Sequence, residues 1–137
     1  MRDVDVRLRR RAASTRHMKQ FFLLFIVACS SGSPTGSECP TSNAPTYGSF
    51  GKVFFDTYCT ECHSVNSNAR HDAPSDMNFD TEEEIRQHAG DIDEEAAFGP
   101  KAKNSDMPDL GTAVKTPPTD EERALLGQFL ACEQAGK

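Results

Sequence analysis

A five-residue motif near the middle of the chain, Cys-Thr-Glu-Cys-His at residues 59–63, constrains the fold more than any other stretch. Two thiols three positions apart can each add to a vinyl group of haem, and the adjacent imidazole can then bind the iron. A redox-active dithiol would not need the histidine, and a zinc knuckle would need a second cysteine pair of similar spacing, which the sequence does not contain. The motif therefore predicts one covalently bound c-type haem, attached at Cys59 and Cys62 and ligated by His63.

The first 28 residues have the pattern of an export signal. A short charged stretch at residues 18–20 precedes an apolar run at residues 21–28, which is too short to span a bilayer. Residues 1–17 are basic and show no sustained apolar pattern, so we expect translation to start at Met18 rather than at Met1. We therefore predict that residues 1–28 are a leader and signal peptide.

The end of this signal resembles the bacterial lipobox. Residues 26–29, Ile-Val-Ala-Cys, place a small residue before Cys29, which in lipoproteins is lipidated and becomes the mature N-terminus. Ordinary cleavage and release is the alternative. By the same resemblance, Ser30 in the next position favours the outer membrane over the inner. The sequence thus predicts an exported protein on the periplasmic side, anchored by lipid without a transmembrane helix.

Residues 29–45 are rich in Ser, Gly and Pro and show no apolar periodicity. Such a composition is typical of flexible linkers, so we predict a tether here, followed by a folded domain at residues 46–135. A domain of about 90 residues buries a modest share of its surface, and a covalently held haem would help to stabilise it.

The part of the chain after the predicted signal is strongly acidic. Residues 29–137 contain 8 Lys and Arg against 19 Asp and Glu, a formal charge of −11, whereas the whole chain has −6 because its leader is basic. An acidic surface disfavours nucleic acid and would attract a redox partner with a basic docking surface. An equally good alternative is that the charge only keeps an exported domain soluble.

The chain has five cysteines, of which the haem motif and the lipobox account for three. Cys39 and Cys132 remain. Because an exported protein meets conditions that permit disulfides, we predict that these two cysteines form one. The alternative is two free thiols, since the residues lie far apart in the sequence.

The spacing of apolar residues predicts a helix at each end of the domain. The first begins near Tyr47 and delivers the chain to the motif, with apolar side chains at intervals of three and four: Phe50, Val53, Phe54 and Tyr58. The last begins at a capping box, Thr119 to Glu122, and its apolar face consists of Leu125, Leu126, Phe129 and Leu130.

Another capping box, Thr81 to Glu84, predicts a helix in the middle of the domain. It should run to about Ala89 and end at Gly90, because glycine favours helix ends. A further short helical piece is expected over residues 93–98. The acidic run around it is interpreted as a solvated face: Asp91, Asp93, Glu94 and Glu95.

Taken together, the haem motif, the Met-Pro pair at residues 107–108 and the two terminal helices resemble the class I monohaem cytochromes c, in a bacterial lipoprotein form. The resemblance covers roughly residues 46–133. It implies an all-α fold in which the terminal helices cross near a right angle and loops enclose the haem. In such a fold a small residue of the first helix lies close to an aromatic residue of the last, and Gly51 and Phe129 would fill these roles.

The same resemblance implies the rest of the haem site. Met107 would be the sixth iron ligand. The Pro74 carbonyl would accept a hydrogen bond from the second ring nitrogen of His63, which orients the ring. Arg70 would face a haem propionate, although a solvated loop arginine is the simpler interpretation. Three other side chains are alternatives to Met107 as the sixth ligand: Met77, His71 and His88.

An iron with histidine and methionine ligands has no open site, so the sequence predicts a lipid-anchored electron carrier rather than an enzyme. One alternative is an open-site haem enzyme or gas sensor, in which Met107 is displaced and His71 or His88 assists a ligand. Another is a cytochrome subunit docked on a larger oxidoreductase. The expected partners are redox proteins and the membrane, and no nucleic acid.

Overall fold

The computed structural model describes residues 32–111 and 114–137, and in these ranges the protein is all-α, as predicted. Its elements in chain order are the π-helix η1 (Tyr47–Gly51) and the α-helices α1 (Lys52–Tyr58), α2 (Glu82–Gln87), α3 (Ala89–Ala96) and α4 (Asp120–Gln134). The described part contains no strand. Within it, every helix is too short or too polar to cross a membrane. The predicted signal peptide and the lipidation site at Cys29 lie outside the described residues.

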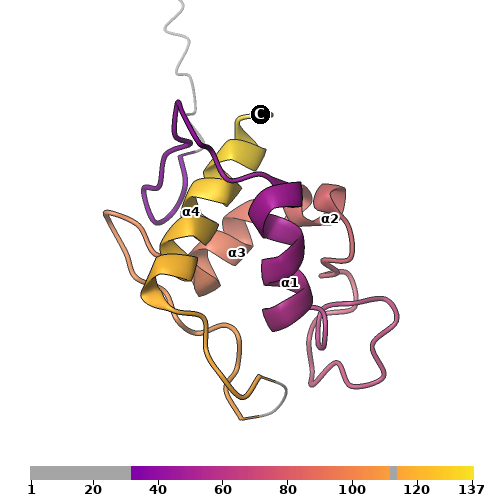
Figure 1. The fold of residues 1–137 in the computed structure, drawn as a ribbon. Helices are drawn as coiled ribbons and strands as arrows, with labels where there is room; N and C mark the ends of the chain where they lie inside the picture. Colours follow the sequence, from indigo (N-terminus) through magenta and orange to yellow (C-terminus); the bar gives the residue numbers. More distant parts are fainter. Residues whose placement is uncertain (1–31, 112–113) are drawn as a thin grey trace, which may run out of the picture.

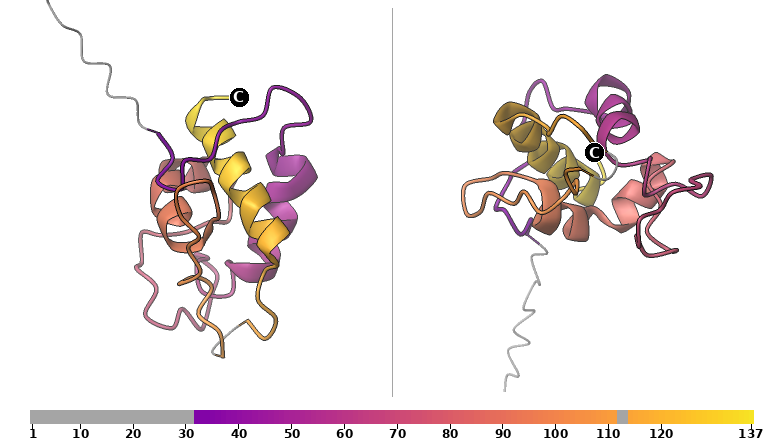
Figure 2. Two further views of the ribbon diagram at one scale, coloured as in Figure 1. Left: turned by 90° about the vertical axis from the view of Figure 1, so that its left-hand side faces the viewer. Right: turned by 90° about the horizontal axis from the view of Figure 1, so that it is seen from below.

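The helices pack together at one end of the molecule, and the long loops gather at the other (Figure 1). The loop after α1 and the loop before α4 both extend from the end at which α1 finishes, and the left view of Figure 2 agrees. The core between the helices consists of buried apolar side chains: Phe54, Phe55, Phe79, Ile85, Ala89, Ile92, Ala96, Ala97, Leu126, Phe129 and Leu130. This arrangement places the end of α1, and hence the Cys-Thr-Glu-Cys-His motif, among the loops.

The first helix forms where it is predicted, but it begins with a π-helical turn. The amides of Phe50 and Gly51 both donate to the Thr46 carbonyl, at 2.9 and 3.1 Å, and the Thr46 side chain caps the turn. A π-helical turn inserts an extra residue and so shifts the register of the helix after it. In α1, Phe54 and Phe55 are buried, whereas Val53 is 68% exposed, so the prediction that Val53 belongs to the apolar face is wrong.

The middle of the domain contains two helices in immediate succession. The predicted capping box is confirmed, because the Thr81 hydroxyl accepts from the Glu84 amide and the Glu84 carboxylate accepts from the Thr81 amide. The predicted stop at Gly90 is wrong, since α2 already ends at Gln87 and Gly90 lies inside α3. Burial explains why a glycine is tolerated there: α3 places three apolar side chains in the core, those of Ala89, Ile92 and Ala96.

The last helix begins at the predicted capping box, Thr119 to Glu122. Leu126, Phe129 and Leu130 are fully buried, while Leu125 is 40% exposed. The predicted contact between the terminal helices is confirmed: a β-carbon at Gly51 would lie 2.8 Å from Cζ of Phe129. Because real β-carbons essentially never come so close, only glycine fits at this position without a shift of the ring.

The segment before the helical domain is packed onto it, so the prediction of a flexible tether over residues 29–45 is wrong for its described part. Ser33 and Thr35 are buried. The Asp93 carboxylate in α3 accepts from the Ser33 hydroxyl (2.7 Å), the Thr35 amide (2.7 Å) and the Thr35 hydroxyl (2.8 Å). Asp93 is itself fully buried, which also overturns its interpretation as part of a solvated face. The hydroxyl-rich sequence supplies partners for a buried carboxylate, a use that its composition does not reveal.

The packed segment is also joined covalently to the last helix. Cys39 and Cys132 form a disulfide across 93 residues of sequence, as the cysteine count predicted. Cys132 lies buried near the end of α4. The segment at residues 33–39 is therefore part of the folded domain, held by α3 through hydrogen bonds and by α4 through the disulfide.

Candidate functional site

The loop end of the molecule contains a cavity of about 580 Å³, within the range of ordinary ligand pockets. The three chemically active side chains of the motif, Cys59, Cys62 and His63, all line it. The predicted sixth ligand Met107, which lies 44 residues beyond His63, lines the same cavity. Its other lining residues, largely apolar, are Phe54, Tyr58, Arg70, His71, Asp72, Ala73, Pro74, Met77, Phe79, Asp91, Ile92, Glu95, Ala96, Pro108, Asp109 and Val114.

Of the alternatives to Met107, the structure brings two to the cavity. Met77 and His71 line it, and His88 is not among its lining residues. His88 instead lies edge-on to the Phe79 ring, with 6.1 Å between ring centroids, and 3.5 Å from the Asp91 carboxylate.

The backbone fixes the motif as a tight turn at the end of α1. The amides of Cys62 and His63 both donate to the Cys59 carbonyl, at 3.1 and 2.8 Å. The His63 carbonyl in turn accepts from the Phe79 amide (2.8 Å), and the two rings stack with centroids 4.6 Å apart. Both thiols are free and partly buried. The turn thus presents two thiols and one imidazole to a single cavity.

The second ring nitrogen of His63 has a backbone partner, but not the predicted one. Nδ1 of His63 lies 3.0 Å from the Met77 carbonyl, to which it can donate. The prediction that Pro74 provides this acceptor is wrong, because the Pro74 carbonyl accepts from Arg70 instead. Pro74 remains a lining residue of the cavity. The contact orients the imidazole and leaves its Nε2 for a metal.

Arg70 organises the loop that carries these acceptors. Its Nη1 donates to the Ser64 carbonyl and to the Asn78 side chain, both at 2.7 Å. Its Nη2 donates to the carbonyls of Pro74 and Met77, and its Nε to that of Ala73. Neither sequence interpretation, a propionate partner or a solvated arginine, describes this role. A signal was available: Arg70 is the one Lys or Arg in residues 53–85, in a loop whose carbonyls need donors.

Met107 lies in an irregular segment whose backbone is held by two helices. Its amide donates to the Glu95 carbonyl of α3 at 3.0 Å. Its carbonyl accepts from Nη1 of Arg123 in α4 at 2.7 Å. The Met107 side chain is 42% exposed and lines the cavity. Sequence reasoning gave no role to Arg123, because an arginine one turn into a helix normally faces solvent.

Burial controls the titration of the three motif side chains. It raises the pKa of the Cys59 thiol to about 12, and it raises the pKa of Cys62, with further contributions from Glu61 and Asp109. Burial also lowers the pKa of His63. At neutral pH the thiols are therefore protonated and the imidazole is neutral. A reactive dithiol needs a lowered thiol pKa, so these shifts disfavour a thiol–disulfide exchange site, and a neutral imidazole is the form that binds metals.

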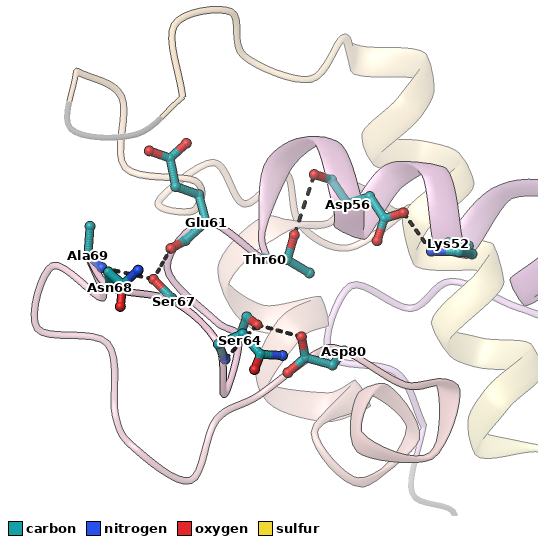
Figure 3. A pocket seen from close by; sticks show the side chains of 10 residues that line it. Lys52, Asp56, Thr60, Glu61, Ser64, Ser67, Asn68, Ala69 and Asp80 are labelled. Carbon is teal, nitrogen blue, oxygen red and sulfur yellow. Dashed lines mark hydrogen bonds and ion pairs between the residues drawn. The ribbon is translucent and has the colours of Figure 1, made fainter.

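A second, polar groove of about 480 Å³ is lined by Thr60 and Glu61, the two motif residues that do not line the cavity (Figure 3). Its side chains bond mainly to one another and to nearby backbone: Lys52 pairs with Asp56 at 2.7 Å, and Ser64 donates to Asp80. Thr60 and Ser67 donate to backbone carbonyls. None of the side chains predicted to hold a haem is among its lining residues. This groove is the hydrogen-bonded outer surface of the loop, and we assign it no ligand.

Comparisons with models of protein families, with curated proteins and with solved structures found no match. The structure by itself defines the class: a small all-α domain with a largely apolar cavity at its loop end, lined by two free thiols, two imidazoles and two thioethers.

Proposed function

We propose that this protein is a lipid-anchored electron carrier of the class I cytochrome c type, located on the periplasmic side of the membrane. One observation carries the proposal: all four side chains that the sequence assigned to a haem line one cavity. They come from two segments 44 residues apart, and nothing in the motif itself requires Met107 to lie there.

The donor set fits a covalently bound haem. Cys59 and Cys62 are free thiols three positions apart on one turn, as thioether attachment needs. His63 has its Nδ1 engaged by the Met77 carbonyl, which makes Nε2 the metal-binding nitrogen. Met107 would supply a thioether sulfur from the irregular segment before α4. The lining is largely apolar, which suits a macrocycle.

When bound, the haem would supply reversible one-electron chemistry at its iron. The chain's own residues would orient the imidazole, offer a thioether from the same cavity and cover part of the macrocycle with apolar side chains. These roles need no nucleophile or proton donor, so we propose a carrier and not an enzyme.

Charge at the cavity suggests the kind of partner. Asp72, Asp91 and Glu95 line the cavity and are exposed, and the part of the chain after residue 28 has a formal charge of −11. Acidic groups at the mouth of a redox site would steer a partner with a basic docking surface. Cys29 would carry the lipid that holds the protein at the membrane, with the outer membrane favoured by Ser30.

The test of this proposal is spectroscopy of the full chain, produced in a bacterium that attaches c-type haem. The wild type should carry one covalent haem and show the far-red absorption band of a methionine sulfur bound to ferric haem. The variant Met107→Ala should lose this band and have a lower reduction potential. Met77→Ala is the matched control, because Met77 lines the same cavity, and it should keep the band.

Two results would contradict the proposal. A chain that is exported but carries no covalent haem, while a known cytochrome c matures in the same cells, would exclude the cofactor. Tight binding of CO by the reduced wild type at neutral pH would exclude the closed ligand pair and favour an open-site haem protein.

A further inference from the structure

Arg123 is a buried cation whose hydrogen bonds go to backbone carbonyls. It lies in the first turns of α4 and is 3% exposed. Its Nη1 donates to the carbonyls of Ala96 (2.7 Å), Met107 (2.7 Å) and Asn104 (3.3 Å). Three acceptors from the end of α3 and from the irregular segment after it thus converge on one nitrogen.

An arginine in such a place needs an explanation, because burying a guanidinium is costly. Burial lowers its pKa, and the nearby Asp120 carboxylate offsets part of that shift. The Phe98 ring covers the guanidinium at 5.6 Å. An apolar residue would avoid the desolvation cost, yet it would leave the three carbonyls without this donor. The gain from arginine is therefore a defined position for the backbone that carries those carbonyls.

The other hydrogen bonds of the segment between α3 and α4 also fix the position of its backbone. The Met107 amide donates to the Glu95 carbonyl, and the Asn104 amide donates to the Ala97 carbonyl, both at 3.0 Å. The Asn104 side chain donates to the Asp93 carbonyl at 3.0 Å. The amide of Met107 is thus fixed to α3 and its carbonyl to α4, while its side chain remains partly exposed at the cavity.

We infer that Arg123 is the positioning residue for Met107: its bond to the Met107 carbonyl holds that residue at the cavity, where the thioether can reach a metal held by His63. The inference rests on the proposed function for the role of the thioether. The part that concerns the backbone does not depend on any cofactor.

The test compares three variants of the full chain. Arg123→Met keeps an apolar stem of similar length and removes all donors. Arg123→Lys keeps the charge and can restore one or two of the bonds. Lys52→Met is the control, with the same change of charge on α1, where Lys52 pairs with the exposed Asp56 away from the cavity lining. Two readouts are used: the far-red methionine band of the haem-loaded protein, and hydrogen exchange of residues 104–109 before haem attachment.

The expected result is loss of most of the far-red band in Arg123→Met, with partial rescue by Arg123→Lys and no change in Lys52→Met. Exchange in residues 104–109 should be at least tenfold faster in Arg123→Met than in the control. A band and an exchange rate unchanged in Arg123→Met would overturn the inference. If Arg123→Met does not fold, Arg123→Lys becomes the test. A full far-red band and wild-type hydrogen exchange in Arg123→Lys, which lacks the guanidinium, would likewise overturn the inference.

The two proposals fail in distinguishable ways. Absence of haem in the wild type contradicts the proposed function, and hydrogen exchange then still decides whether Arg123 fixes the segment. Haem with a far-red band that survives Arg123→Met supports the function and overturns the positioning role.

Discussion

Two irregular segments flank the cavity, and one arginine donates hydrogen bonds to each. The two arginines differ in how far along the sequence they lie from the groups that they bind. In the proximal segment, residues 64–79, Arg70 bonds to groups three to eight positions away. In the distal segment, residues 97–110, Arg123 reaches back to acceptors 16 to 27 positions away. The first arginine belongs to the loop that it holds, and the second belongs to α4.

This difference determines what each segment depends on. Contacts between near neighbours close with little loss of chain entropy, so the proximal segment can retain its shape when distant parts of the fold loosen. The distal segment also bonds to α3, but the three bonds from Arg123 form only while α4 is docked beside α3. The side of the cavity that presents His63 is thus locally determined, and the side that presents Met107 is tied to the stability of the whole domain.

Removal of the disulfide should give the largest effect, and it tests the difference between the two segments. The double variant Cys39→Ala/Cys132→Ala releases a closed loop of 93 residues that includes the attachment of α4. The chain-entropy model predicts a loss of about 4 to 5 kcal/mol in the free energy of unfolding, measured by denaturant titration. Hydrogen exchange should accelerate more in residues 97–110 than in residues 64–79. Equal acceleration in both segments would contradict the contrast.

A smaller effect is expected from Arg70→Met, which removes the hydrogen bonds that the guanidinium donates to the proximal segment. Because Arg70 is only partly buried, water can replace some of these bonds, and we expect a loss of about 2 kcal/mol in the free energy of unfolding. Hydrogen exchange should accelerate in residues 64–79 and stay unchanged in residues 97–110. Faster exchange in the distal segment would show that the two segments are coupled.

The smallest effect concerns Tyr58, which links α1 to α4. Its hydroxyl donates to the Glu122 carboxylate at 3.2 Å, and we expect Tyr58→Phe to lower the free energy of unfolding by about 1 kcal/mol at pH 7. Burial and this hydrogen bond raise the pKa of Tyr58 above 10.0. Above pH 10 the unfolded phenol loses its proton while the folded one retains it, so the wild type loses stability and its advantage over Tyr58→Phe shrinks. A stability difference between the wild type and Tyr58→Phe that grows with pH would contradict the raised pKa of Tyr58.

Features encoded by neighbouring residues were predictable from the sequence. The capping boxes at Thr81 and Thr119 needed residues three positions apart, and both formed. The contact of Gly51 with Phe129 followed from a family resemblance, and the disulfide followed from counting cysteines. The motif itself predicted the haem, which stays a prediction.

Hydrogen bonds of charged and polar side chains to partners that the sequence does not mark were not predictable. The buried Asp93 looked like part of an acidic surface, because the hydroxyls that satisfy it lie 58 to 60 positions earlier in the chain. Arg123 received no role for the same reason. The acceptor of His63 was assigned to Pro74 and is Met77, since the path of an irregular loop is set by Arg70 and not by the count of residues.

The anchoring of residues 33–39 to α3 and α4 would limit how far the domain could move from the lipid proposed at Cys29. Ser33 is already buried in the domain, so four residue steps separate it from Cys29. A fully extended chain of that length spans about 14 Å. If Cys29 carries the proposed lipid, a domain on so short a connection could not sweep the periplasm for a soluble partner. It would diffuse in the plane of the membrane with its anchored end toward the lipid, so encounters with a partner would be two-dimensional collisions between neighbours on one membrane.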